Sequence, residues 1–162
     1  MKRLGIAFSG PSNSGKTTLI LKVAKRFLES NLKVAIIKHD PSDKAKFDVE
    51  GKDSYKFSSL GVDVVVTSPT RTTYFNKSQK DLNDIIKMID NFDILIVEGL
   101  KTLPLPRISI FRDSIEESYL KFSNAIATNN LNYSGELKHF DVNDDLNISK
   151  WILENADRKS VV

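Results

Sequence analysis

Residues 10–17 read GPSNSGKT, and this short stretch constrains the fold more than any other part of the chain. It matches the pattern G-x-x-x-x-G-K-[ST] and comes just after the hydrophobic run LGIAF. In this pattern the glycines let the backbone wrap, so that successive N–H groups point inward at phosphate oxygens. The following helix adds its positive N-terminal end, the lysine reaches the terminal phosphates, and the last hydroxyl ligates Mg²⁺. The stretch therefore predicts a phosphate-binding loop between a buried strand and a helix.

The hydrophobic pattern around this loop predicts alternating strands and helices. Strands are expected at residues 3–9, 33–38, 62–68, 71–76, 92–99, 107–112 and 124–129. Helices are expected around residues 20–27, 52–60 and 82–89, and from about residue 148. The strand at 33–38 is expected to be buried, whereas 71–76 and 107–112 alternate in a way typical of sheet edges. This order indicates an α/β protein of the three-layer phosphate-loop NTPase class, with a mostly parallel sheet flanked by helices.

Length and composition favour a single phosphate-loop nucleotide-binding domain over residues 1–162. Apolar residues make up 40% of the chain and charged residues 28%, as in ordinary globular proteins. The net charge of +3 is spread along the sequence, so we expect no nucleic-acid and no membrane partner. Cysteine is absent, which excludes disulfides, thiolate metal sites and cysteine nucleophiles. The apolar run near the start is too short for a signal peptide, so a cytoplasmic location is expected.

Two carboxylates come at the ends of predicted strands, where α/β sheets bind ligands. Asp40 follows one strand and Glu98 ends another. In phosphate-loop proteins a carboxylate at such a position holds Mg²⁺ directly or through water. We therefore expect Thr17, Asp40 and Glu98 to hold the metal, and Lys16 to act with the two carboxylates in catalysis. Asp40 precedes a proline and could instead form a turn. Asp93 begins its strand, so it is expected at the far end of the sheet.

A polar run before the second expected helix offers further candidates. The residues at 51–54, Gly-Lys-Asp-Ser, could contact an anionic ligand, but Asp53 or Ser54 could equally cap the helix. His39 could orient water or bind substrate, and a surface or capping role fits a lone histidine just as well. With two histidines and no cysteine, a dedicated transition-metal site is not expected.

Four motifs occur together in a set order: GPSNSGKTT, IIKHD, GKDSYKFSSLGVDVVV and VEGLKTLPLPRISIFR. In order and spacing, over roughly residues 2–129, they resemble the MobB-type molybdopterin-guanine dinucleotide biosynthesis adaptor proteins. The resemblance implies GTP and Mg²⁺ binding, weak GTP hydrolysis and a homodimer. It also implies a partner, the molybdenum cofactor guanylyltransferase, which attaches GMP to molybdopterin. Whether molybdopterin itself is bound stays open.

The resemblance also assigns a nucleotide-binding set by position. This set comprises Gly10, Pro11, Ser12, Asn13, Ser14, Gly15, Lys16, Thr17, Thr18, Lys38, His39, Asp40, Gly51, Lys52, Asp53, Ser54, Glu98, Gly99 and Lys101. The segment at 125–130, AIATNN, stands where the family ends a strand near the guanine. The N-K-x-D signature that makes guanine choice explicit in many GTPases is absent. A preference for guanine over adenine is therefore implied by the resemblance alone.

A small-molecule phosphoryl-transfer kinase is the main alternative function. Such kinases usually carry a lid with several arginines, and the arginines of this chain are scattered: Arg3, Arg26, Arg71, Arg107, Arg112 and Arg158. A metal-insertion GTPase is disfavoured by the missing cysteines. No arginine neighbours the phosphate loop in sequence, so we expect slow GTP hydrolysis by the isolated protein. The segments 71–76 and 107–112 are the candidate dimer contacts, because an exposed sheet edge invites pairing.

Overall fold

A computed structural model describes residues 3–89 and 91–157 of the chain. These residues belong to two compact units. Unit 1 comprises Met1–His39 and Ile89–Val162, and unit 2 comprises Asp40–Met88. The single domain expected from the sequence stays a prediction. Within the described residues, no helix combines the length and the apolar character that crossing a membrane requires.

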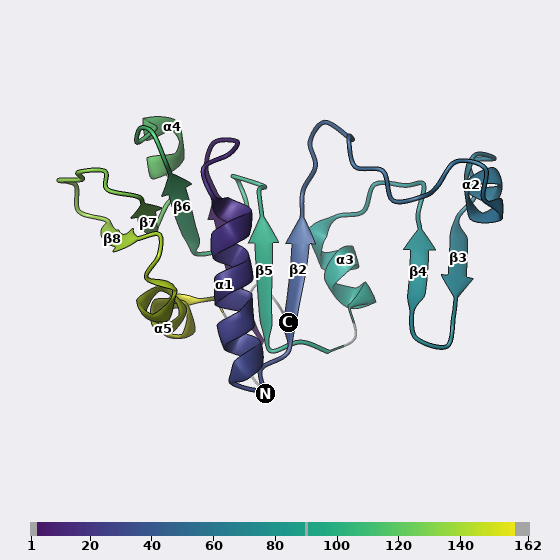
Figure 1. The fold of residues 1–162 in the computed structure, drawn as a ribbon, viewed down its shortest axis with the longest axis horizontal. Coiled ribbons are helices and arrows are strands. Elements are labelled where there is room, and N and C mark those ends of the chain that lie inside the picture. The colour runs from purple at the N-terminus through teal and green to yellow at the C-terminus, as the bar shows by residue number, and fades with distance from the viewer. Residues whose placement is uncertain (1–2, 90, 158–162) are drawn as a thin grey trace. The chain divides into compact units, whose positions relative to one another are not determined.

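Unit 1 is built on a six-stranded sheet in the order β2-β5-β1-β6-β7-β8, in which every neighbouring pair is parallel (Figure 1). The strands are β1 (Leu4–Ser9), β2 (Val34–Lys38), β5 (Ile94–Glu98), β6 (Arg107–Phe111), β7 (Ala125–Thr128) and β8 (Lys138–Asp141). A parallel sheet flanked by helices confirms the expected fold class. Because the strands are parallel, their carboxyl ends meet at one edge, which is where open α/β sheets bind ligands.

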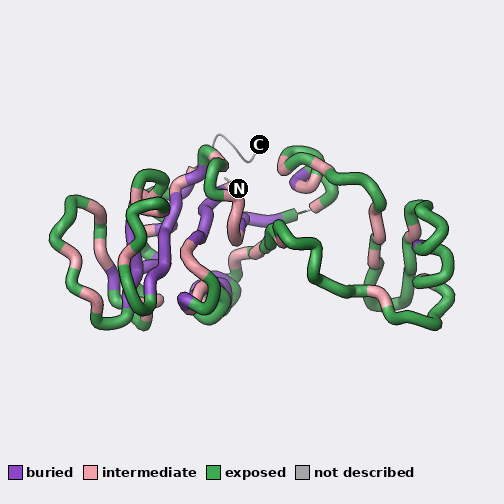
Figure 2. Tube along the Cα trace, turned by 90° about the horizontal axis from the view of Figure 1, so that it is seen from above, coloured by how far each residue is buried: buried purple, intermediate pink, exposed green. Residues whose placement is uncertain are grey.

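Two helices pack side by side on one face of this sheet, α1 (Lys16–Glu29) and α5 (Asp145–Asn155) (Figure 1). The apolar residues of α1 are spaced at helical intervals and point into the core: Leu19, Ile20, Val23, Ala24 and Phe27. They join Ile6 and Phe8 of β1 and Ile148 and Ile152 of α5 in one buried cluster. Figure 2 shows this buried interior along the strands. The short helix α4 (Glu117–Leu120) and the strand β8 were not expected from the sequence.

Strands β2 and β6 lie in positions opposite to those expected. The expected buried strand β2 is an edge of the sheet, and Ile36 is 47% exposed. The expected edge strand β6 lies between β1 and β7, and all its residues are buried. Most of its polar side-chain atoms have partners inside the fold, because Arg107 donates through Nη1 and Nη2 to backbone carbonyls and Ser109 Oγ lies 2.8 Å from Ser9 Oγ. Nε of Arg107 is buried and has no partner among the described residues. The prediction that residues 107–112 offer a free edge for dimerisation is therefore wrong.

Unit 2 contains α2 (Asp53–Ser58), β3 (Val64–Thr67), β4 (Thr72–Phe75) and α3 (Leu82–Met88). The strands expected at 62–68 and 71–76 are present, but they pair antiparallel with each other in a separate two-stranded sheet. The helix α2 ends at Ser58 with Ser59 as its C-cap, two residues before Gly61. Gly61 lies in the turn to β3 and has a φ of 81°, a left-handed conformation that glycine adopts without strain. Much of this unit is exposed (Figure 2).

Candidate functional site

The loop between β1 and α1 requires glycine at its first position. Gly10 has a φ of 139°, and a Cβ added there would lie 2.2 Å from the carbonyl oxygen of Ile110 on β6. Gly15 caps the start of α1 with a φ of 97°, and a Cβ there would meet nothing within 4 Å. The first turn of α1 carries no acidic residue. The positive end of the helix therefore faces the loop with no carboxylate from its own first turn to neutralise it.

Lys16 folds its side chain back over this loop. Its Nζ donates to the carbonyl oxygens of Gly10 at 3.0 Å and Pro11 at 2.5 Å. Burial lowers the pKa of Lys16, nearby Glu98 opposes this by raising it, and Lys38 adds to the lowering. A partly desolvated ammonium held by neutral carbonyls interacts more strongly with phosphate oxygens, because these acceptors carry negative charge.

The loop also contains a buried hydroxyl that is not satisfied by the protein. Ser14 is 7% exposed, and its Oγ has no hydrogen-bond partner among the described residues. The same Oγ lies 3.0 Å from the position of a Cβ on Gly10, which places it inside the loop. Because a buried polar atom without a partner is costly, a ligand oxygen at this place would satisfy it. The loop therefore fits a phosphate group.

Glu98 lies at the carboxyl end of β5, with β1 on one side and β2 on the other. Its side chain is 13% exposed, and its Oε2 lies 3.7 Å from Nζ of Lys38 on β2. The structure thus brings together Glu98, Lys38 and Lys16, as expected. Within residues 3–89 and 91–157, no group of three or more histidine or acidic side chains is placed to hold a metal ion. A site for Mg²⁺ here would draw on Glu98, the exposed hydroxyl of Thr17 and phosphate oxygens, which is the kind of shell Mg²⁺ prefers.

The segment after β5 is held by close contacts to its neighbours. Gly99 has a φ of 93°, and a Cβ there would lie 3.3 Å from the Cβ of His39. The backbone N–H of His39 donates to the carbonyl of Glu98 at 3.0 Å. Lys101 lies over the ring of Tyr119, with its Nζ 3.5 Å from the ring centroid. His39 and Gly99 therefore lie beside Glu98, whereas the ammonium of Lys101 interacts with an aromatic ring.

Two arginines of the motif VEGLKTLPLPRISIFR belong to this region, although neither was assigned to the site from the sequence. Arg107 is 1% exposed, and its guanidinium donates to the carbonyls of Gly99, Leu100 and Leu103. It therefore fixes the segment that follows Glu98. Arg112 follows β6, and its Nη1 donates to the carbonyl of Asn13 in the phosphate loop at 3.4 Å. The signal in the sequence was its place at the end of that motif, as the last residue of the strand expected at 107–112.

Asp40 belongs to unit 2, where its carboxylate organises its own loop. Oδ2 accepts from the backbone N–H groups of Lys44 and Ala45, both at 2.7 Å, and Oδ1 accepts from Ser42 at 3.2 Å. These contacts match the turn-forming alternative considered for this residue. Its expected role at the metal stays a prediction.

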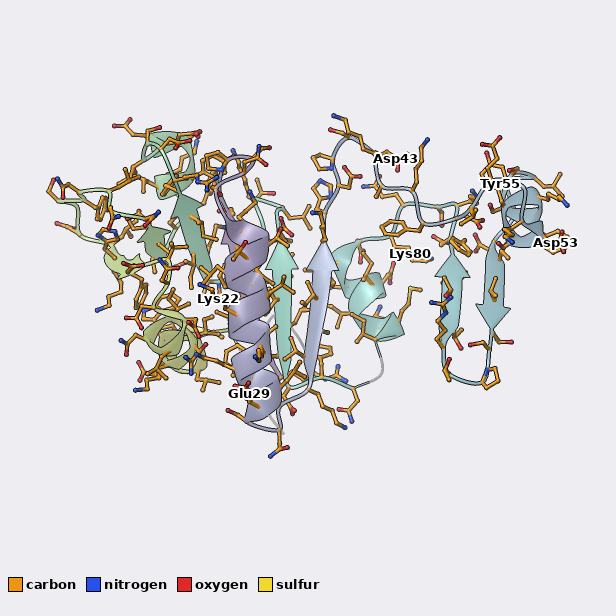
Figure 3. The ribbon with its side chains drawn as sticks, in the orientation of Figure 1. Lys22, Glu29, Asp43, Asp53, Tyr55 and Lys80 are labelled. Carbon is orange, nitrogen blue, oxygen red and sulfur yellow. The ribbon has the colours of Figure 1, made fainter. Side chains whose placement is uncertain are left out.

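The predicted residues at 51–54 also belong to unit 2, at the start of α2. The N-cap of this helix is Lys52, without a side-chain cap, so neither Asp53 nor Ser54 caps it. Ser54 donates its hydroxyl to Asp48 at 2.8 Å, and Asp53, labelled on α2 in Figure 3, pairs with the lysine three residues further on. Contact of this segment with an anionic ligand stays a prediction.

Comparison with known proteins identifies the family. The family model described as MobB, molybdopterin guanine dinucleotide synthesis protein B, matches residues 5–129. A molybdopterin-guanine dinucleotide biosynthesis adapter protein of Haemophilus influenzae is 29% identical over 132 residues, covering 76% of this chain and 74% of the relative. The adapter protein of the same name from Escherichia coli is 31% identical over 115 residues, covering 67% of this chain and 65% of the relative.

Solved structures agree with this assignment. The crystal structure of a molybdopterin-guanine biosynthesis protein B superposes with a TM-score of 0.76 at 25% identity, covering 93% of this chain and 99% of that one. Bacillus subtilis MobB has the same fold, with a TM-score of 0.76 at 23% identity over 95% of this chain and 98% of that one. The family match, the curated relatives and the phosphate loop between β1 and α1 agree, and the chain belongs to the MobB family.

Proposed function

We propose that the protein is a GTP-binding adapter with weak GTPase activity, which assists the attachment of GMP to molybdopterin. The observation that carries this proposal is the phosphate loop, in which Gly10, Ser14 and Lys16 leave a partly desolvated, positively charged cradle at the start of α1. The names of the Haemophilus influenzae and Escherichia coli relatives support the adapter role. The choice of guanine rests on the family.

The residues of unit 1 have distinct roles in this proposal. Lys16 exchanges its two carbonyl partners for oxygens of the terminal phosphates, and the N–H groups at the start of α1 bind the phosphate chain. Thr17 and Glu98 would hold Mg²⁺, which when bound neutralises charge on the phosphates. Lys38 lies 3.7 Å from Glu98, so its charge fixes the position of that carboxylate.

Hydrolysis is expected to be slow in the isolated protein. Efficient transfer of a phosphoryl group needs a positioned water and a positive group on the developing charge. No glutamine follows β2 or β5 to orient a water. We therefore expect a turnover on the order of one per minute or less, against roughly 1 to 10³ per second for typical enzymes. Rapid turnover would contradict the adapter role, and transfer of phosphate to a small molecule would favour a kinase.

We also propose a homodimer that is located in the cytoplasm. Within the described residues, β3 and β4 pair only with each other, so the two-stranded sheet keeps unpaired edges. Val65, Val66 and Tyr74 on these strands are exposed. Edges of this kind favour pairing with a second chain. Sedimentation at micromolar concentration, with and without GTP, tests the dimer, and a monomer under both conditions would contradict it.

Calorimetric titration with GTP, GDP and ATP in the presence of Mg²⁺ tests nucleotide binding. Lys16→Ala should abolish or greatly weaken GTP binding, because it removes the charge in the loop. Lys25→Ala is the matched control, since Lys25 is an exposed lysine on the same helix, paired at 3.9 Å with Glu29. Unchanged GTP affinity in a folded Lys16→Ala protein would refute the proposed site. The adapter role is then tested by adding the parent protein or Lys16→Ala to a guanylyltransferase and measuring formation of the dinucleotide.

A further inference from the structure

Arg112 is held next to the phosphate loop by the packing of β6 against β1. The carbonyl of Ile110 occupies the space where Gly10 would carry a Cβ, and Ser109 Oγ bonds to Ser9 Oγ at 2.8 Å. These contacts fix the end of β6 against the start of the loop. Arg112 follows two residues after Ile110, and its Nη1 reaches the carbonyl of Asn13. The packing of the sheet therefore fixes the backbone position from which Arg112 reaches the loop.

The charge of Arg112 is not neutralised by the protein. Its side chain is exposed, and no carboxylate in residues 3–89 and 91–157 forms an ion pair with it. The hydrogen bond to Asn13 is long, at 3.4 Å, and its acceptor is a neutral carbonyl. A phosphate oxygen would be a stronger acceptor, because it is negatively charged and a phosphate can accept two parallel hydrogen bonds from one guanidinium.

Arg112 and Glu98 lie on opposite sides of β1. Glu98 and its partner Lys38 belong to β5 and β2, whereas Arg112 follows β6 on the other side. In the proposed site, the terminal phosphates lie next to Lys16 and the metal ligands. A phosphate chain that runs along the loop therefore has its nucleoside end on the side of β6.

We propose that Arg112 is a nucleotide-binding residue that contacts the phosphate nearest the nucleoside, an inference that rests on the proposed GTP site. Its planar fork of donors is suited to two oxygens of one phosphate. That phosphate is shared by nucleoside di- and triphosphates, so Arg112 contributes to the affinity for both. This role differs from that of an arginine that acts on the terminal phosphate alone.

Titration of GTP and GDP into the parent protein, Arg112→Gln, Arg112→Lys and Lys25→Gln tests this assignment. Lys25→Gln removes the same charge from an exposed position in the last turns of α1, far along the helix from the loop. We expect Arg112→Gln to weaken GTP and GDP binding by the same factor, about tenfold or more, and Lys25→Gln to change both little. Arg112→Lys should fall between the parent and Arg112→Gln, because it keeps the charge and loses the fork.

Each other outcome overturns the assignment in a distinguishable way. Binding by Arg112→Gln equal to that of Lys25→Gln, while the parent binds GTP, would refute the role of Arg112 and leave the proposed function intact. If Arg112→Gln weakens GTP binding but leaves GDP binding unchanged, Arg112 contacts the terminal phosphate. That result would refute its assignment to the phosphate nearest the nucleoside. Absence of nucleotide binding by the parent protein would refute the proposed function and this inference together.

Discussion

Substitution of the two loop glycines by alanine separates a steric requirement from a conformational one. Gly10 and Gly15 both have positive φ, at 139° and 97°, where an alanine is strained. Their surroundings differ. A Cβ on Gly10 would lie 2.2 Å from the backbone oxygen of Ile110, whereas a Cβ on Gly15 would meet nothing within 4 Å. Gly15→Ala therefore reports the backbone strain, and Gly10→Ala reports the same kind of strain plus a collision with β6.

The magnitudes follow from these two effects. Positive φ costs a non-glycine residue of order 1–3 kcal/mol. Overpacking against a part of the fold that cannot move adds about 1–3 kcal/mol, and the oxygen of Ile110 is backbone in an interior strand, so it cannot rotate away. We expect Gly10→Ala to be less stable than Gly15→Ala by about 2 kcal/mol. For a chain of this length that difference corresponds to roughly 4–8 °C in Tm.

Urea denaturation of the parent and both variants, followed by circular dichroism, measures this difference. Equal unfolding free energies for Gly10→Ala and Gly15→Ala would show that the contact with Ile110 does not constrain the loop. That result would also remove the basis for placing Arg112 beside the loop, because the same contact holds the end of β6 there. Calorimetric titration of the folded variants with GTP then shows whether the collision also displaces the phosphate cradle.

Two further predictions concern stability. Arg107→Met should cost about 2 kcal/mol, because it leaves three half-buried carbonyls without their donor, and hydrogen exchange should increase at residues 99–103. Unchanged exchange there would refute the anchoring role. The hydrogen bonds that Asn147 donates lower the pKa of Asp144 at the start of α5. A carboxyl whose pKa is lower in the folded than in the unfolded protein stabilises the fold at pH values above its unfolded pKa. This stabilisation is lost as the pH falls through the pKa of the folded state. Asp144→Ala should therefore be less stable than the parent at pH 7. Thermal melts should show the difference in Tm between the two proteins shrinking below about pH 3.9. A difference in Tm that does not change with pH would contradict this prediction.

The phosphate loop and α1 could be predicted from the sequence because their signals are local. The motif fixes the loop, and the spacing of Ile20, Val23, Ala24 and Phe27 fixes the buried face of the helix. The positions of β2 and β6 could not be predicted in this way. Serine and arginine in β6 suggested an exposed edge, but their partners come from β1 and from the segment after β5. Such partners become visible only when the strand order is known.

The pairing of β3 with β4, by contrast, has a local cause that the strand pattern does not capture. Residues 68–71 are the whole connection between the two strands. A parallel pair needs a crossover of a dozen or more residues, whereas a connection this short permits only an antiparallel pair. The residues Ser68, Pro69 and Thr70 are also typical of a turn. The length of the connection alone therefore separates this hairpin from the parallel sheet.

The two carboxylates chosen from the sequence now lead to different expectations. Glu98 is nearly buried beside Lys38 and close enough to Lys16 to influence its pKa, so its charge belongs to the phosphate site. The oxygens of Asp40 instead accept three backbone N–H groups of its own loop. Glu98→Gln should lower Mg²⁺-dependent GTP hydrolysis by about tenfold or more, equivalent to about 1.4 kcal/mol in the barrier. Asp40→Asn should lower it less.

The expected effect of Asp40→Asn is on the loop itself. An asparagine keeps one oxygen but presents an amide N–H₂ group to backbone donors, so at least one of the three hydrogen bonds must be lost. Limited proteolysis should therefore cleave residues 40–45 faster in Asp40→Asn than in the parent, and Glu98→Gln serves as the control with this loop unchanged. If Asp40→Asn abolishes hydrolysis while the cleavage rate stays at the parent value, Asp40 acts at the metal and its loop contacts are secondary. If Glu98→Gln hydrolyses GTP at the parent rate, the charge beside Lys16 is not part of the reaction, and the metal must depend on other ligands.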